Sequence, residues 1–197
     1  MTAMKKSSRR GKPKGDKRAR TRARLIEAAA AVIGEKGYES ASLAEIAARA
    51  GMTRGAIYGN FKSREELLFA FIESRWAPER PQLVKGAPLP AQLRIIGQYI
   101  ARSAEQRRAA AVGALSFQIF LLTHEKIRQQ MAAANREIYS VIAKDLLNYV
   151  DARELSMPIE KFVRVLHALG DGLMFCRFLE PENYSDDVII AAFEALA

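Results

Sequence analysis

The stretch from residue 42 to residue 62, SLAEIAARAGMTRGAIYGNFK, limits most strongly what this chain can fold into. Apolar side chains recur at i, i+3, i+4 and i+7 across residues 43–50, which predicts a short helix with one apolar face. Ser42, with Glu45 three residues later, is a capping box that marks where this helix begins. Gly51 follows directly, and glycine readily adopts the left-handed conformation that ends a helix.

A second short helix is predicted after the glycine, with Thr53 as its N-cap and Ile57 on its inner side. A helix, a short turn that contains glycine and a second helix form the helix-turn-helix of DNA-binding proteins. The outward positions of the second helix suit contact with DNA, because they carry two cations, two hydrogen-bonding side chains and two glycines that permit close approach: Arg54, Lys62, Tyr58, Asn60, Gly55 and Gly59. Phe61 is expected in the small core rather than on DNA.

Positive charge is concentrated ahead of this motif. The formal net charge is +9, yet residues 1–24 hold eleven lysines and arginines against one aspartate, a net +10, and the remainder is −1. Residues 1–20 are also polar and rich in Gly, Ser and Pro, which predicts a disordered basic arm. Such an arm favours contact with a polyanion. The alternative is a tail that serves only solubility or derives from cloning.

The rest of the chain reads as helices only, so the expected fold class is all-α. A three-helix helix-turn-helix domain is expected over residues 21–81, with a first helix from Thr21 to Lys36 and a further capped helix from Ser63. A connector with four prolines follows, and residues 90–197 read as a second helical domain of about five helices. Its segment 107–123 is nearly continuously apolar, which predicts a central helix.

Several classes of protein are disfavoured. Cys176 is the single cysteine, so a disulfide framework is excluded, and a lone cysteine in an apolar helix is a weak candidate for a redox sensor. His124 and His167 are the only histidines, and no metal site or cofactor is expected. No signal peptide and no apolar run of about 18 residues is present, which predicts a cytoplasmic protein with no membrane partner. The sequence contains no nucleophile–base pair and no phosphate loop, so an enzyme is not expected.

The segment TRARLIEAAAAVIGEKGYESASLAEIAARAGMTRGAIYGNFKSREELLFAFI resembles the N-terminal domain of TetR-family transcriptional regulators. Within it, TRGAIYGNFKSREELL is similar to the AcrR-like branch. The resemblance implies that residues 53–60 enter the major groove, with Arg54 reading guanine and neighbours holding phosphates. Gly59 departs from the bulkier residue common in the family. The implied DNA-binding residues are Ser42, Leu43, Thr53, Arg54, Gly55, Tyr58, Asn60 and Lys62.

The resemblance also implies that the C-terminal domain binds a ligand and forms a homodimer. Seven residues are candidates for a ligand pocket, although sequence periodicity alone does not separate a cavity from a filled core: Phe117, Phe120, Leu121, Met131, Tyr139, Phe175 and Phe178. Glycines inside an apolar helix favour close helix approach. The candidates for a dimer interface are Leu166, Gly170, Gly172, Leu173, Ile190 and Phe193.

The function that the resemblance implies is a ligand-responsive repressor. It would bind a near-palindromic double-stranded DNA operator as a homodimer and be released by an apolar or aromatic small-molecule inducer. The alternative from the residues is an architectural or weakly specific DNA-binding protein driven mainly by the basic arm. Dependence of binding on DNA sequence distinguishes the two.

Overall fold

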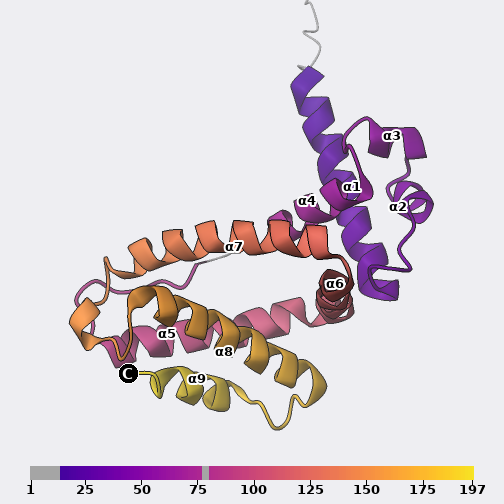
Figure 1. Ribbon diagram of the computed structural model, residues 1–197. Helices are drawn as coiled ribbons and strands as arrows, with labels where there is room; N and C mark the ends of the chain where they lie inside the picture. The colour runs from indigo at the N-terminus through magenta and orange to yellow at the C-terminus, as the bar shows by residue number, and fades with distance from the viewer. Residues whose placement is uncertain (1–13, 77–79) are drawn as a thin grey trace, which may run out of the picture. The chain divides into compact units, whose positions relative to one another are not determined.

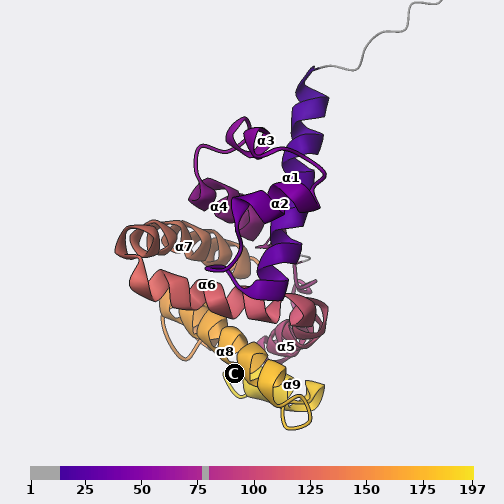
Figure 2. The same ribbon diagram turned by 90° about the vertical axis from the view of Figure 1, so that its right-hand side faces the viewer.

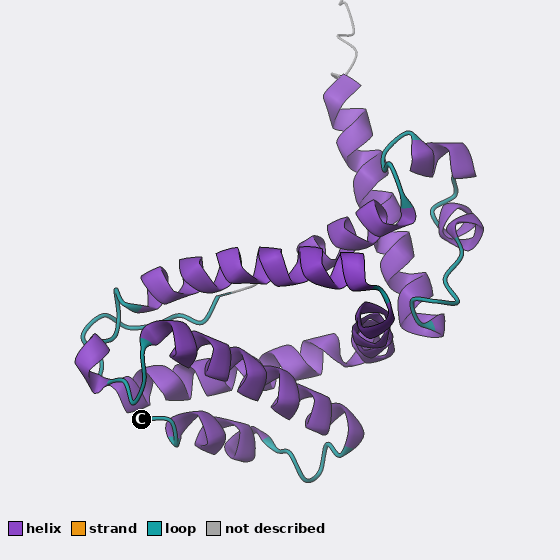
Figure 3. Ribbon diagram, in the orientation of Figure 1, coloured by secondary structure: helices purple, strands orange, loops and turns teal. Residues whose placement is uncertain are grey.

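The computed structural model describes residues 14–76 and 80–197, and the first thirteen residues and residues 77–79 lie outside the described part. The described residues form helices joined by loops, with no strand among them (Figure 3), so the all-α prediction is confirmed. They belong to two compact units, residues 1–77 and residues 78–197. Within the described part, no helix has the length and apolar character needed to cross a membrane.

The first unit contains four helices in its described part (Figure 1). They are α1 (Lys14–Lys36), α2 (Leu43–Arg49), α3 (Arg54–Tyr58) and α4 (Arg64–Trp76). Gly37, with φ +79°, follows the end of α1, as expected for a left-handed residue. A small core holds the helices together and includes Leu25, Val32, Ile33, Tyr38, Ile46, Ile57, Phe61 and Leu67. Phe61 is 2% exposed, which confirms its predicted place in the core.

Helix α1 begins earlier than predicted. It starts at Lys14 instead of about Thr21, so the disordered arm predicted over residues 1–20 is wrong for residues 14–20. The remainder of that arm, residues 1–13, lies outside the described residues. Lysine, arginine and alanine are strong helix formers, and extending a helix whose other half is already packed requires no new nucleation. Charge and polarity alone were therefore a poor guide to disorder here.

The second unit contains α5 (Leu89–Arg107), α6 (Ala111–Thr123), α7 (Glu125–Leu146), α8 (Ile159–Leu179) and α9 (Asp186–Glu194), with short 3-10 helices at Arg108–Ala110 and Ala152–Glu154. The helix order after the connector matches the expected five. Its core is built mainly from α5, α7, α8 and α9, and includes Leu93, Ile96, Leu146, Phe162, Val163, Ile189 and Phe193. Helices α5 and α9 approach closely at Gly97, where an added Cβ would lie 2.9 Å from the Ile190 Cα.

Helix α6 is not the central helix that its composition predicts. One side is buried through Gly113, Phe117 and Phe120. The other side is apolar but open, and Ile119 and Leu122 are 65% and 78% exposed. An all-round apolar sequence predicts burial in general, yet it does not say which of the neighbouring helices, or which partner, provides the cover.

A buried glutamine fixes the connector to the second unit. Gln92 of α5 has no exposed surface, and its Oε1 accepts from the Val84 N–H at 3.1 Å. Its Nε2 donates to the main-chain oxygens of Val84, Ala87 and Tyr149, the last two at 3.3 Å. Because a buried amide is costly when unpaired, these bonds hold the connector against α5 and the end of α7.

Candidate nucleic-acid interface

The helix α2 begins and ends as its sequence predicts. The Glu45 N–H donates to Ser42 Oγ at 3.1 Å, and the Ser42 N–H donates to Glu45 Oε2 at 3.3 Å, which confirms the capping box. Gly51 follows with φ +63°, a conformation that residues with a Cβ rarely adopt. The turn to α3 is therefore set by two local signals, a capped start and a left-handed stop.

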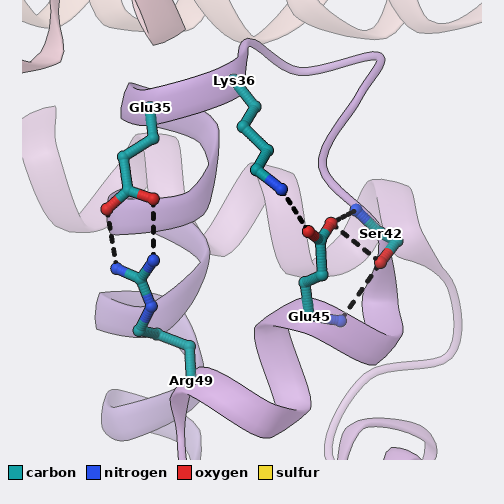
Figure 4. Close-up of polar contacts among 5 residues, drawn as sticks. All are labelled: Glu35, Lys36, Ser42, Glu45 and Arg49. Carbon is teal, nitrogen blue, oxygen red and sulfur yellow. Dashed lines mark hydrogen bonds and ion pairs between the residues drawn. The ribbon is translucent and has the colours of Figure 1, made fainter.

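Ion pairs fix the face of α2 that lies against α1 (Figure 4). Arg49 donates two hydrogen bonds to the Glu35 carboxylate, at 2.8 and 2.7 Å, and Lys36 donates to Glu45. The Lys36 bond, followed by the bonds from Ser42, lowers the pKa of Glu45, and the Arg49 bond lowers the pKa of Glu35. Glu45 occupies both the N–H and the hydroxyl of Ser42, so a phosphate at Ser42 would have to displace this carboxylate.

Two arginines of α1 hold the far ends of α2 and α3. Arg24 Nη2 donates to the main-chain oxygen of Ala50 at 2.7 Å, beside Gly51. Arg22 Nη1 donates to the main-chain oxygen of Asn60 at 3.1 Å, and its guanidinium lies 4.2 Å from the centroid of the Phe61 ring. These carbonyls belong to helix ends, where no intrahelical donor remains. The two arginines therefore fix the angle of α3 on α1.

A third arginine, Arg64 at the start of α4, binds the segment that follows α1. The Arg64 guanidinium lies 4.4 Å from the centroid of the Tyr38 ring and donates to the main-chain oxygens of Tyr38 and Glu39. Burial raises the pKa of the Tyr38 phenol to about 12. Sequence reasoning missed all three braces and counted Arg22 and Arg24 among the charges available to phosphates. One signal was present: Arg22 is three residues before buried Leu25, on the inner face of α1.

The outer face of α3 is left open by this bracing. Thr53, Arg54, Gly55, Tyr58 and Lys62 are all exposed, Tyr58 by 56%. Within residues 14–76 and 80–197, the side chains of Arg54, Tyr58 and Lys62 make no hydrogen bond or ion pair. Thr53 occupies the N-cap position, but its side chain makes no capping bond. The structure thus leaves these five predicted residues exposed along α3 and in the residues that flank it.

Two predicted DNA contacts are placed differently. Asn60 turns inward: its Nδ2 donates to the main-chain oxygen of Ala56 at 2.7 Å, and its Oδ1 is buried. An amide used in this way is not available to DNA, which corrects the DNA contact predicted for Asn60. The sequence could not show this, because the short helix α3 ends just before Asn60 and the side chain folds back on it. Leu43 is half-buried on α2.

The predicted ligand-pocket residues do not converge. A groove of about 170 Å³ lies between α7 and the start of α8, and among the seven candidates only Tyr139 lines it. Phe117, Phe120 and Met131 are buried, whereas Phe175 is 42% exposed on α8, which corrects its assignment to an interior pocket. The Tyr139 hydroxyl lies 3.2 Å from His167 Nδ1, and His167 Nε2 lies 3.6 Å from Asp171. Burial raises the pKa of Tyr139.

The predicted dimer-interface residues also divide into two groups. Leu166, Gly170 and Phe193 are buried inside the second unit, and a Cβ on Gly170 would lie 3.2 Å from Ile100 Cδ1. The close approach that Gly170 permits is therefore made by α5 and α9 of the same chain, which corrects these three. Gly172 is exposed with nothing within 4 Å of an added Cβ, while Leu173 and Ile190 are partly buried.

The described side chains form no group of three or more His, Cys, Asp or Glu that could hold a metal ion. The arrangement at α2 and α3 instead offers what a nucleic-acid surface needs: a rigid frame and an open end that carries a guanidinium, an ammonium and two hydroxyls. Phosphate contacts would position such a helix, and a guanidinium would read a base edge.

Comparison with known proteins agrees with this geometry. Residues 25–71 match the family model described as "Bacterial regulatory proteins, tetR family". The probable HTH-type transcriptional regulator ArpR of Pseudomonas putida is 28% identical over 174 residues, which cover 83% of this chain and 82% of ArpR. The HTH-type transcriptional regulator TtgR, also of Pseudomonas putida, is 29% identical over 175 residues, which cover 83% of this chain and 82% of TtgR.

Solved structures share the fold. The crystal structure of NalD, the secondary repressor of the MexAB-OprM multidrug efflux pump in Pseudomonas aeruginosa, superimposes with a TM-score of 0.65. It is 22% identical in sequence, and the match covers 90% of this chain and 93% of NalD. The likeness includes helices of both compact units and shows that the fold is a shared one.

Proposed function

The chain belongs to the TetR family of transcriptional regulators, and from this premise we propose that it is a ligand-responsive repressor that binds a near-palindromic operator as a homodimer. The first unit binds DNA, with α3 in the major groove. The second unit carries the dimer interface and binds a small apolar or aromatic inducer. Members of this family are regulators and not enzymes, so no catalytic step is involved. The site of action is the cytoplasm, where operator DNA is reached.

The observation that carries the proposal is the contrast between the two faces of α3. Its inner face is buried through Ile57, and the following Phe61 is equally enclosed. Its outer face presents Arg54, and Lys62 is exposed in the loop that follows; neither has an ion-pair partner in the described part of the chain. Cations left unpaired beside a rigid helix suit a polyanion, and a guanidinium can donate two bonds to guanine O6 and N7.

Release by an inducer follows from linkage. If a ligand in the second unit favours an arrangement that fits the operator less well, then DNA and ligand must weaken each other's binding by the same factor. NalD is, by the name of its structure, a repressor of a multidrug efflux pump. That description supports repression for this chain as well, and the names of ArpR and TtgR support transcriptional regulation.

Selection of bound sequences from a random pool of double-stranded DNA tests the proposal. The expected result is a near-palindromic site with half-sites about one helical turn (~34 Å) or a multiple apart, occupied by chains in pairs, as measured by the mass of the complex. Recovery of unrelated sequences, bound with equal affinity, would instead support the architectural alternative.

The inducer is tested on the selected operator with a panel of uncharged aromatic compounds. A compound that binds the free protein and releases it from DNA supports the mechanism. Its affinity must be lower for the DNA-bound protein by the same factor. A bound compound that leaves the operator affinity unchanged does not act as an inducer.

A further inference from the structure

The first turns of α1 include two cations, Lys17 and Arg18, that take no part in bracing the helix-turn-helix. Residues 14–20, KGDKRAR, have a net charge of +3 and are helical. Lys17 and Arg18 are exposed, and within the described residues their side chains make no hydrogen bond or ion pair. We call this segment, residues 14–20, the α1 extension.

The register of α1 places these two cations in line with the arginines that brace the ends of α2 and α3. Arg18 lies four residues, about 6 Å along a helix, ahead of Arg22, whose guanidinium reaches Asn60 at the end of α3. Lys17 lies seven residues, or two turns, ahead of Arg24, which reaches Ala50 before the turn. In both views of the first unit the N-terminal end of α1 continues past α3 (Figures 1 and 2). The two cations thus lie one to two turns outward of the two arginines that brace α2 and α3.

We propose that the α1 extension is a preformed phosphate-binding surface for double-stranded DNA next to the half-site that α3 reads. Lys17 and Arg18 bind phosphates and contribute affinity but no base preference. This inference rests on the proposed function, since it assumes that α3 lies on an operator. It goes further by extending the bound region beyond the base pairs that α3 reads.

Duplex DNA is the occupant that the observations favour. The surface is cationic, and it belongs to the same compact unit as the exposed residues of α3. A duplex bears one negative charge per roughly 1.7 Å of its axis, so an element projecting past α3 meets further phosphates of the same duplex. The helix is already formed, so binding requires no ordering of the backbone, in contrast to an arm that folds on binding.

The test compares the wild type with Lys17→Gln/Arg18→Gln on the selected operator. Operator affinity is measured at several salt concentrations, with long flanks and with flanks trimmed to the half-sites. On long DNA the variant should lower the magnitude of the slope of log K against log[salt] by roughly 0.9 for each phosphate that the side chains no longer neutralise. Trimming the flanks should weaken operator binding by the wild type by the same factor as the double substitution does on long DNA. The affinity of the double variant should be nearly the same with long and with trimmed flanks. The ranking of operator sequences should not change.

Three controls make the result decisive. Arg102→Gln/Lys126→Gln removes the same charge from exposed positions of the second unit, and should leave the slope unchanged. Equal melting temperatures of the variant and wild type exclude a folding defect. Deletion of residues 1–13 measures the preceding segment separately.

The inference is wrong if the Gln double variant keeps the wild-type slope, if trimming weakens both proteins equally, or if only deletion of residues 1–13 changes the slope. If the α1 extension instead binds an acidic protein, the double variant should bind DNA as the wild type does. That result would also contradict the inference. Failure of the wild type to prefer any DNA sequence is a different outcome, and would count against the proposed function itself.

Discussion

Arg24 donates from Nη2 to the main-chain oxygen of Ala50 at 2.7 Å, and so closes the C-terminal end of α2 from outside the helix. The residue next in sequence is Gly51, in the left-handed conformation. A cation at a helix C-terminus also complements the negative end of the helix dipole. Together these features make the turn between α2 and α3 a fixed corner rather than a flexible link.

Replacing either bracing arginine should destabilise the first unit. Arg22→Met and Arg24→Met each keep an apolar stem but leave a helix-end carbonyl without its donor, at a cost of roughly 1–3 kcal/mol. Thermal unfolding of the variants measures the cost. Arg18→Met is the matched control: the same change one turn away should leave the melting temperature unaltered. Equal effects at positions 18 and 22 would contradict the bracing role.

Arg54→Ala should weaken binding to the selected operator by roughly 1–3 kcal/mol, because the side chain that makes the bidentate base contact is removed. The preference at one base pair of each half-site should relax at the same time. Lys62→Ala is the comparison, since removal of a phosphate-binding side chain weakens all sequences about equally. A uniform loss of affinity for Arg54→Ala, measured on operator and random DNA, would reassign Arg54 to the phosphates.

Gly55→Ala should separate stability from DNA binding. An added Cβ at Gly55 would meet only Thr53 Oγ1 at 3.6 Å, an ordinary contact, so the chain itself does not require glycine there. Alanine is favoured over glycine in helices by roughly 0.5–1 kcal/mol. The variant should melt at the same or a higher temperature and yet bind the operator less tightly, because the methyl group holds the duplex away. Unchanged operator affinity would show that DNA does not approach this position.

The α2–α3 motif was predictable because its determinants are local. The capping box spans three residues, and Gly51 lies next to the helix that it ends. The braces were not predictable in the same way, because Arg24 and Arg22 reach partners 26 and 38 residues away in sequence. From the sequence alone, such an arginine cannot be told apart from an unpaired surface cation. Its bracing role becomes evident only when its carbonyl acceptor is known.

In the second unit, too, local features were predictable from the sequence and contacts between distant residues were not. A glycine inside the helix α8 correctly indicates close approach at Gly170, but sequence does not say which helix approaches, and the neighbour is Ile100 of the same chain. The number and order of helices after the connector followed from periodicity. The cover of α6 did not, because an apolar side chain such as Leu122 is compatible with either a core or an open surface.

Acid should loosen the contact between α1 and α2. The ion-pair partners lower the pKa of Glu35 and Glu45 in the folded chain. Their stabilisation is therefore present above the unfolded pKa of about 4.3 and is lost as pH falls through the lower folded values. In a series measured from pH 7 downward, the melting temperature should decrease once the pH is below about 4.3. The decrease should be less steep in Glu45→Gln. Glu39→Gln, an exposed carboxyl outside this network, should retain the wild-type dependence.

Gly97→Ala should destabilise the second unit. The new Cβ would lie 2.9 Å from the Ile190 Cα, so the main chain of α9 must shift, and overpacking of this kind costs roughly 1–3 kcal/mol. Gly172→Ala, where nothing lies within 4 Å, should not destabilise the isolated chain. Urea unfolding followed by circular dichroism measures both. A Gly97→Ala protein as stable as the wild type would show that α5 and α9 can separate without penalty.

The continuity of α1 has a consequence for how such a regulator changes over generations. Its later turns are tied to α2 and α3 through Arg22 and Arg24, so substitutions of these residues should disturb the fold. Its first turns bear Lys17 and Arg18, whose side chains make no hydrogen bond or ion pair within the described residues, so these two cations can be lost with little effect on folding. If these two cations bind phosphates as proposed, their gain or loss changes the affinity for an operator in small steps while the recognised bases stay the same.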